Sequence, residues 1–244
     1  MSGVAVAGRA PALQLLCAGA VKGLVEALRE RFRAGRGATI DARFGAVGAM
    51  REALLAGAPC DVLVVTEAML AELREQNRIA AAPLVPIGEV RTGVAARAGD
   101  ALPRIDSAAS LKAALLGAPA LYVPDTVRST AGRHVVSVLE RLGLAAELAA
   151  RLSEHPNGAT AMRALSESGA PGALGCTQAT EILYTPGLAL VGALPEPFGL
   201  STVYAAGVGR DSAEPALAAA FIALLAGDDA ATTRRVGGFE PAAR

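Results

Sequence analysis

The sequence has little aromatic surface and no net charge. Phe, Tyr and Trp make up 3% of its 244 residues, Trp is absent, and 23 basic residues balance 23 acidic ones. Aromatic platforms that stack sugars or single-stranded bases are therefore disfavoured. The balanced charge provides no field to hold a nucleic acid or a membrane surface. An anionic ligand would have to be bound locally, by backbone groups and a few side chains.

Cysteine and histidine are also scarce. The three cysteines, Cys17, Cys60 and Cys176, have no metal-type spacing and cannot all pair within one chain. We interpret them as small buried residues of a reducing compartment, with a reactive thiol as the alternative. His134 and His155 lie in no Asp or Cys pattern, so no metal site is expected. His155 is interpreted as a surface loop residue, with a general acid or base beside a ligand as the alternative.

Long apolar runs and cofactor motifs are missing as well. No run reaches the ~18 apolar residues that a membrane span needs. The beginning of the chain lacks the basic and apolar regions of a leader, so the chain as given is expected in the cytoplasm, or in the periplasm if a leader was removed. A nucleophile elbow, a Walker loop and a dinucleotide fingerprint are absent. No cofactor is expected, and any catalytic residue is unknown.

The first part of the chain alternates short apolar strands with helices. Strands are predicted over residues 13–17, 39–44 and 62–65, and helices begin near residue 21, after the turn 46–48 and near residue 67. This alternation predicts βαβ units with a mostly parallel sheet and right-handed crossovers. Ligands of such sheets bind at the carboxyl ends of the strands. The small-residue turns 18–20 and 46–48 are therefore expected at a ligand site.

A second α/β block follows. Helices are predicted over residues 108–116, 132–142, 144–152 and 159–168, and buried strands over 120–123 and 172–177. The strands 89–96 and 201–208 are interpreted as crossings between the two blocks. An interior Gly93 in the first of them marks a bend or a close backbone approach. A helix over 215–225 returns to the first block, and residues 237–244 are interpreted as a frayed tail.

The predicted fold class is α/β, with two lobes joined by the two crossing strands. The first lobe comprises residues 1–90 and 201–244, and the second lobe comprises residues 91–200. Two lobes connected in this way form a hinged clamp, and the cleft between them is the expected ligand site.

The strand–helix junctions supply the candidate ligand-binding residues, because backbone N–H groups at helix N-termini attract anions. These are Gly19, Ala20, Ala46, Val47, Gly48, Ser129, Thr130, Asn157, Thr177 and Gln178. Arg128 and Arg133 are candidates for pairing with the anion. The alternatives are tight turns and helix caps for the junctions, and a solvated helix face for the arginines. Glu181 is interpreted first as stabilising a helix N-terminus, with catalysis as the alternative.

Four segments resemble, in order, those of the molybdate-binding protein family of bacterial ABC importers. They are Cys17-Ala18-Gly19-Ala20-Val21, Phe44-Gly45-Ala46-Val47-Gly48-Ala49-Met50, Ala56-Gly57-Ala58-Pro59-Cys60-Asp61-Val62 and Gly175-Cys176-Thr177-Gln178-Ala179-Thr180-Glu181. The resemblance covers nearly the whole chain, and the third segment is its most specific part. It implies a type II periplasmic-binding-protein clamp, with an ABC permease as partner if the chain is exported.

Three positions depart from that family. The resemblance implies oxyanion-binding serines where this chain has Ala20 and Val47, and a tyrosine near Gln178. Each missing charge-assisted hydrogen bond is worth about 1.5–3 kcal/mol, so molybdate is not the expected ligand. Backbone donors beside apolar walls suit a carboxylate with a carbon skeleton, which predicts a small organic anion with two or three carboxylates.

Three alternatives to a clamp that binds a small organic anion remain open at this point. The broader superfamily that the chain resembles includes aconitate isomerase, so proton transfer on an unsaturated tricarboxylate is the second hypothesis, although the sequence offers no unambiguous base. A sensor that reports its ligand through lobe closure is a third. True molybdate or tungstate binding is a further alternative.

Overall fold

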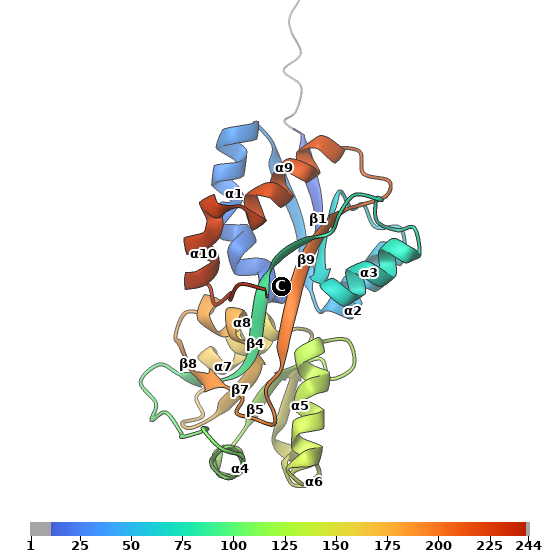
Figure 1. Cartoon of the computed structure of the whole chain (residues 1–244). Helices are drawn as coiled ribbons and strands as arrows, with labels where there is room; N and C mark the ends of the chain where they lie inside the picture. The colour runs from blue at the N-terminus through green and yellow to red at the C-terminus, as the bar shows by residue number, and fades with distance from the viewer. Residues whose placement is uncertain (1–10, 243–244) are drawn as a thin grey trace, which may run out of the picture.

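Within residues 11–242, which this computed structural model describes, nine strands form one mixed sheet (Figure 1). Their order is β2-β1-β3-β9-β4-β7-β5-β6, and β8 pairs with β4 beside this path. The strands are β1 (Ala12–Ala18), β2 (Thr39–Gly45), β3 (Val62–Thr66), β4 (Val85–Arg97), β5 (Leu121–Pro124), β6 (Leu152–His155), β7 (Leu174–Gln178), β8 (Leu188–Ala193) and β9 (Ser201–Val208).

Helices alternate with these strands along the chain. The α-helices are α1 (Lys22–Arg36), α2 (Val47–Leu55), α3 (Glu67–Glu75), α4 (Ala108–Gly117), α5 (Thr130–Arg141), α6 (Ala145–Leu148), α7 (Gly158–Glu167), α8 (Ala179–Tyr184), α9 (Pro215–Ala226) and α10 (Ala231–Val236). The short 3-10 turns are η1 (Gly19–Val21), η2 (Ala149–Arg151) and η3 (Asp228–Ala230). The α/β class predicted from the alternation is therefore confirmed.

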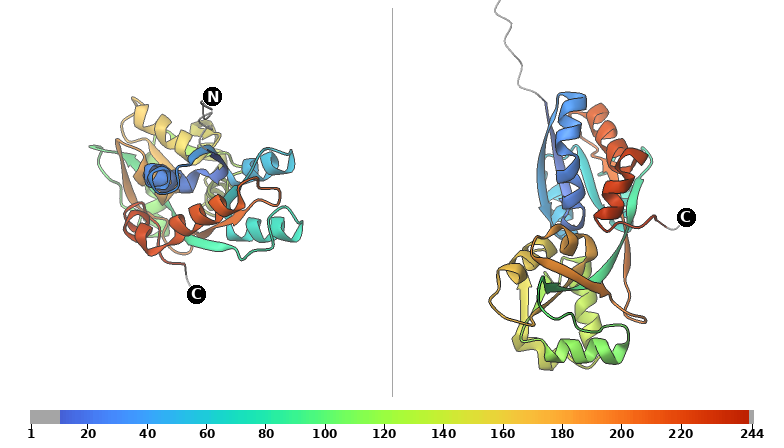
Figure 2. Two further views of the ribbon diagram at one scale, coloured as in Figure 1. Left: turned by 90° about the horizontal axis from the view of Figure 1, so that it is seen from above. Right: turned by 90° about the vertical axis from the view of Figure 1, so that its left-hand side faces the viewer.

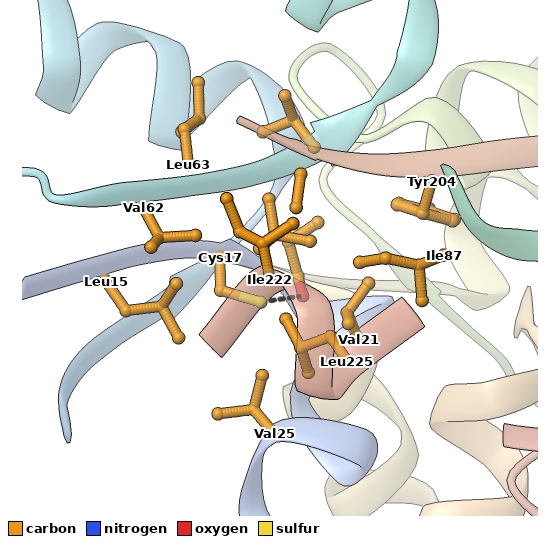
Figure 3. Packing of buried hydrophobic residues seen from close by; sticks show 14 of the residues in the cluster. Leu15, Cys17, Val21, Val25, Val62, Leu63, Ile87, Tyr204, Ile222 and Leu225 are labelled. Atoms are coloured by element: carbon orange, nitrogen blue, oxygen red, sulfur yellow. Dashed lines mark hydrogen bonds between the residues drawn. The ribbon is translucent and has the colours of Figure 1, made fainter. Parts of the chain in front are cut away.

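The first lobe is built on the parallel strands β2, β1 and β3, with β9 antiparallel to β3 (upper half of Figure 1). Its core is apolar and closely packed, and Figure 3 shows side chains from β1, β3, β9, α1 and α9 meeting there. The rings of Phe32 and Phe221 join α1 to α9 edge to face, with centroids 5.0 Å apart. Burial of this apolar surface is the main stabilising contribution to the lobe.

The cysteines behave largely as small apolar residues. Cys17 and Cys176 are buried, as predicted, and Cys60 is half-buried. The Cys17 thiol donates to the Ala18 carbonyl over 3.4 Å, within the core shown in Figure 3. Burial raises the pKa of the Cys17 thiol, and it raises those of Cys60 and Cys176 to about 12. Thiols held neutral in this way are poor nucleophiles.

The second lobe is built on the parallel strands β6, β5 and β7, to which β4 and β8 add antiparallel pairs. Its own apolar cluster contains Leu111, Leu121, Val135 and Leu174, among others. A smaller cluster around Met162 and Ile182 lies under α7 and α8. The second lobe therefore has a core of its own below the first one (Figure 2, right).

The strands β4 and β9 run from one lobe into the other and pair with each other between them (Figure 1). Val90 of β4 packs in the core of the first lobe and Val94 in that of the second. A Cβ at Gly93 would lie 2.8 Å from the Gly192 carbonyl oxygen, so the close backbone approach expected there is confirmed. Two antiparallel strands are thus the connection about which the lobes can move.

Two local predictions were wrong. Residues 144–152 do not form one helix, because Leu152 begins the edge strand β6, whose partner is β5. Its sequence has too few apolar residues to indicate a strand, and backbone pairing alone defines it. The tail is not frayed over 237–242: Phe239 is 5% exposed, and Glu240 exchanges backbone hydrogen bonds of 2.8 Å with Glu89. Residues 243–244 lie outside the described residues.

In the part of the chain that the structure describes, no single helix is long and apolar enough to cross a membrane. The bent pair Pro215–Ala226 and Asp228–Val236 meets the criteria of length and composition only.

Candidate ligand site between the lobes

Strand ends from both lobes meet around one small cavity. The first lobe contributes the carboxyl ends of β1 and β2, which pair in parallel so that Ala18 lies opposite Gly45. The second lobe contributes the residues that precede α5, α7 and α8, and Tyr204 comes from the crossing strand β9. The cavity has a volume of ≈ 20 Å³, enough for about one water molecule. The lobes are therefore closed on each other in this conformation.

Most of the residues predicted from the sequence lie on this cavity. Its lining contains Gly19, Ala20, Ala46, Val47, Ser129, Thr130, Asn157 and Gln178. Gly48 follows the lining residue Val47 in the chain, and Thr177 precedes the lining residue Gln178. The Thr177 hydroxyl also donates a hydrogen bond to Glu181, which lines the cavity. Neither Arg128 nor Arg133 lines it. Arg128 is at the mouth, 3.8 Å from Glu52 of the first lobe, and its side chain is 53% exposed.

A wider groove adjoins the cavity between α3, α5 and β9. It has a volume of ≈ 420 Å³, and Val47 and Thr130 line both spaces. Arg133 lines the groove and donates to the Val127 carbonyl over 2.9 Å. A ligand with a carbon skeleton therefore has space to extend beyond the enclosed cavity.

The two lobes differ in how their helix starts are satisfied. Among the described residues, no side chain caps η1 or α2 of the first lobe. In the second lobe, Ser129 accepts from the Gly132 N–H over 3.3 Å, and Asn157 accepts from the Thr160 N–H over 2.9 Å. Ser129 and Asn157 thus act as helix caps, the alternative weighed from the sequence. In the part of the cavity that residues 11–242 form, the helix starts without a cap from the N-cap side chain are therefore η1 and α2 of the first lobe and α8 of the second, where the Glu181 carboxyl lies.

One backbone hydrogen bond joins the lobes at the rim of the cavity. The Gly48 N–H donates to the Arg128 carbonyl over 3.0 Å. A Cβ at Gly48 would lie 3.0 Å from that oxygen and 3.2 Å from the Arg128 Cα, so the small residue permits the approach. Gly48 contributes to closure of the clamp as well as to a helix start.

Several buried polar side chains near the cavity have incomplete hydrogen bonding, and of these Gln178 lines it. Gln178 is 2% exposed, and its Nε2 donates to the Thr202 hydroxyl over 3.4 Å. Its Oε1 has no partner among residues 11–242, nor have the hydroxyls of Thr92 and Thr180. Tyr204 is 2% exposed, and burial raises the pKa of its phenol. Unpaired buried polar atoms are rare in proteins and often belong to binding sites.

Glu181 is the one acidic side chain that residues 11–242 place on the cavity. It is 6% exposed, and its Oε2 accepts from the Thr177 hydroxyl over 2.6 Å. Burial raises the pKa of this carboxyl to about 7, although hydrogen bonds from Thr177 and from the backbone N–H groups of Ala159 and Gln178 lower it. Interaction with the N-terminus of α8, the first interpretation from the sequence, is therefore present. The burial of the carboxyl between the lobes was not predicted.

The sequence reasoning also missed Tyr204. It lies on a strand that was interpreted only as a crossing, and the alternation of that strand does not indicate which face meets the cavity. Neither histidine lines the cavity: His134 contacts the Phe198 carbonyl at 2.7 Å. His155 was interpreted as a surface loop residue, but it is the last residue of β6, half-buried, and stacks on Tyr122 with ring centroids 5.8 Å apart. Within the described residues, no cluster of His, Cys, Asp and Glu could hold a metal ion.

Comparison with known proteins places this architecture in a family. A family model described as bacterial extracellular solute-binding protein matches residues 13–240. Aconitate isomerase from Pseudomonas sp. is 25% identical over 238 residues, which cover 94% of this chain and 87% of that protein.

Many solved structures share the fold. The Azotobacter vinelandii periplasmic molybdate-binding protein aligns with a TM-score of 0.80 at 21% identity, covering 95% of this chain and 100% of that one. L-phospholactate-bound PEB3 aligns with a TM-score of 0.67 at 13% identity, covering 94% and 100%. At these identities the similarity concerns the fold alone.

Proposed function

The chain belongs to the bacterial extracellular solute-binding protein family, and on this premise we propose that it is a clamp for a small organic anion with two or three carboxylates rather than for molybdate. Its fold is that of the type II periplasmic binding proteins, and it is molybdate-binding-like. One observation carries the proposal: the cavity combines uncapped helix N–H groups with the apolar side chains of Ala20 and Val47.

Carboxylates suit this combination. Their oxygens accept hydrogen bonds from backbone N–H groups at helix starts, and their carbon skeleton can contact apolar walls. A tetrahedral dianion such as molybdate has no apolar part, so Ala20 and Val47 would leave its oxygens without partners on that side. PEB3, which shares the fold, was solved with L-phospholactate, an organic anion. A ligand of this size requires the lobes to separate and close again about β4 and β9.

A ligand screen by thermal unfolding tests the proposal. Succinate, tricarballylate and trans-aconitate are compared at 1 mM with molybdate, tungstate and, as an uncharged control, succinamide. A ligand with micromolar Kd stabilises the folded clamp by about 4 kcal/mol at this dose, which raises the Tm by roughly 10 °C. We expect this shift with at least one carboxylate. Stabilisation by molybdate or tungstate alone would contradict the proposal.

Partner and compartment are linked in this proposal. In the periplasm, the clamp would deliver its ligand to an ABC permease. In the cytoplasm, lobe closure would act as the signal of a sensor.

A second candidate function is isomerisation of an unsaturated tricarboxylate. Two observations favour it: the similarity to aconitate isomerase, and a buried carboxyl, Glu181, with its pKa raised to about 7 beside the cavity. As a base, Glu181 would take a proton from the methylene carbon next to the double bond and return it to the far alkene carbon. The C–H bond and the double bond would exchange places without change in composition.

Nuclear magnetic resonance in heavy water tests the second candidate. If the protein is an isomerase, cis- and trans-aconitate interconvert, deuterium enters the methylene carbon, and Glu181→Gln lowers the rate about 10²–10⁴-fold, the usual contribution of a general base. Absence of both interconversion and deuterium uptake excludes this reaction. Binding of trans-aconitate without turnover leaves the clamp as the function.

A further inference from the structure

Glu181 lies where an incoming anion would be held. It is the third residue of α8, and its side chain turns back over the start of that helix. The Thr177 hydroxyl donates to its carboxyl over 2.6 Å, and the backbone N–H groups of Ala159 and Gln178 lie near enough to lower the pKa of that carboxyl. Ala159 belongs to α7, so a carboxyl of the chain itself occupies the starts of two helices of the second lobe.

The carboxyl also contacts the first lobe. A Cβ at Gly19, in the turn after β1, would lie 2.6 Å from Glu181 Oε1. A Cβ at Gly158, in the second lobe, would collide with Oε2. Glycines at these two positions therefore leave the space that the carboxyl fills, and Glu181 spans the cavity from one lobe to the other.

The surroundings of this carboxyl provide no counter-ion. The titratable group that faces it is Tyr204 of β9, which is buried and has a raised pKa, and Cys17 of β1 lies on the other side of that phenol. On α1, which packs against α8, the Lys22 ammonium lies over the rings of Phe44 and Tyr184 at 5.7 and 5.9 Å. The Arg128 guanidinium is at the exposed mouth. Among the described residues, no basic side chain forms an ion pair with Glu181.

A ligand carboxylate that entered this site would meet Glu181 in a poorly solvated space. Two carboxylates in contact there repel each other, whereas a neutral carboxyl donates a strong O–H···O⁻ hydrogen bond. We propose that Glu181 is a ligand-contacting residue that determines specificity as a neutral acid, so that the clamp takes up one proton from solvent when it closes on a carboxylate. This inference rests on the proposed binding function.

Calorimetric titration with trans-aconitate tests it. The third carboxyl of the probe is mostly ionised at pH 6.5 and almost completely so above pH 7.5, so a pH dependence of more than about twofold in this range belongs to the protein. With the pKa of Glu181 at about 7, the neutral fraction before binding falls about 25-fold over this interval, and Kd is expected to rise by the same factor. Titrations in two buffers of different protonation heat are expected to give an uptake approaching one proton at pH 8.5.

Two variants separate this effect from general electrostatics. Glu181→Gln has the same shape and cannot ionise, so its Kd is expected to stay within about twofold across the range, without proton uptake. Glu167→Gln removes an equal charge from the exposed end of α7 and is expected to retain the pH dependence. If Glu181 stayed ionised in the complex, the unmodified protein would take up no proton on binding at pH 8.5, and that result would overturn the inference.

A ligand-free measurement keeps this test independent of the proposed function. Because folding raises the pKa of Glu181, the folded state binds the extra proton, and this contribution to stability is lost as pH rises from about 4.5 to about 7. The difference in Tm between Glu181→Gln and the unmodified protein is therefore expected to shift by about 5–10 °C in favour of the variant when the pH rises from 5 to 8.5. A constant difference overturns the inference. Failure of every carboxylate to bind overturns the clamp proposal instead.

Discussion

Replacing Ala20 and Val47 together by serine is expected to strengthen molybdate binding by about 10²–10⁴-fold, because each hydroxyl adds a charge-assisted hydrogen bond worth about 1.5–3 kcal/mol. The two positions lie just beyond the ends of the neighbouring parallel strands β1 and β2, and both residues line the cavity. The family resemblance implies hydroxyls at these positions in molybdate-binding relatives. The double variant therefore restores the missing donors without moving the backbone.

Calorimetric titration with molybdate measures this gain. Val47→Ala is the matched control, because it removes the same bulk from a 5% exposed position and adds no hydroxyl. The control is expected to lose stability and to gain no molybdate affinity. If the serine variant also binds molybdate no better than the unmodified chain, the hydroxyls are not what limits oxyanion binding, and the argument for a carboxylate ligand loses its main support.

The first-lobe half of the site was predictable because it depends on local pattern. The strands ending at Ala18 and Gly45 have apolar alternation, small residues follow them, and parallel strands place both turns at one edge of the sheet. Asp61, in the most specific segment of the resemblance, accepts from the Gln14 N–H over 2.8 Å and from the Ser212 hydroxyl over 2.6 Å. This motif therefore holds the lobe together and does not reach the cavity.

The remainder of the site depends on contacts that no local pattern contains. Glu181 is buried because Gly19, which is distant in the sequence, closes over it from the other lobe. Tyr204 reaches the cavity because its strand, β9, pairs with both β3 and β4 and so passes between the two lobes. The β6 strand and the ordered Phe239 likewise depend on distant backbone partners. Sequence periodicity predicts which side of a helix or strand is buried. It cannot predict which residues of the other lobe that side will contact.

Gly158→Ala is expected to lower the free energy of unfolding by about 2–4 kcal/mol, the range of severe overpacking. Gly158 is the first residue of α7 and is not among the residues with positive φ, so alanine itself would suit the backbone. The cost comes from the side chains that a Cβ would meet, the Glu181 carboxyl and the Thr177 hydroxyl. Gly35→Ala, inside α1 with no atom within 4 Å of a Cβ, is expected to stabilise by about 0.5–1 kcal/mol.

A double-mutant cycle with Glu181→Ala shows which side chain sets the cost. Without the carboxyl, the Thr177 hydroxyl loses its hydrogen-bond partner and can rotate away from an alanine methyl at 158. We therefore expect a coupling of about 1.5–3 kcal/mol between the two sites in urea unfolding. Additive effects would mean that Glu181 moves aside freely and does not fill the cavity. Strong coupling would mean that the carboxyl is held in place by packing from both lobes. The packing that excludes a larger side chain at Gly158 would then also hold the Glu181 carboxyl in the position where it meets a ligand when the lobes close.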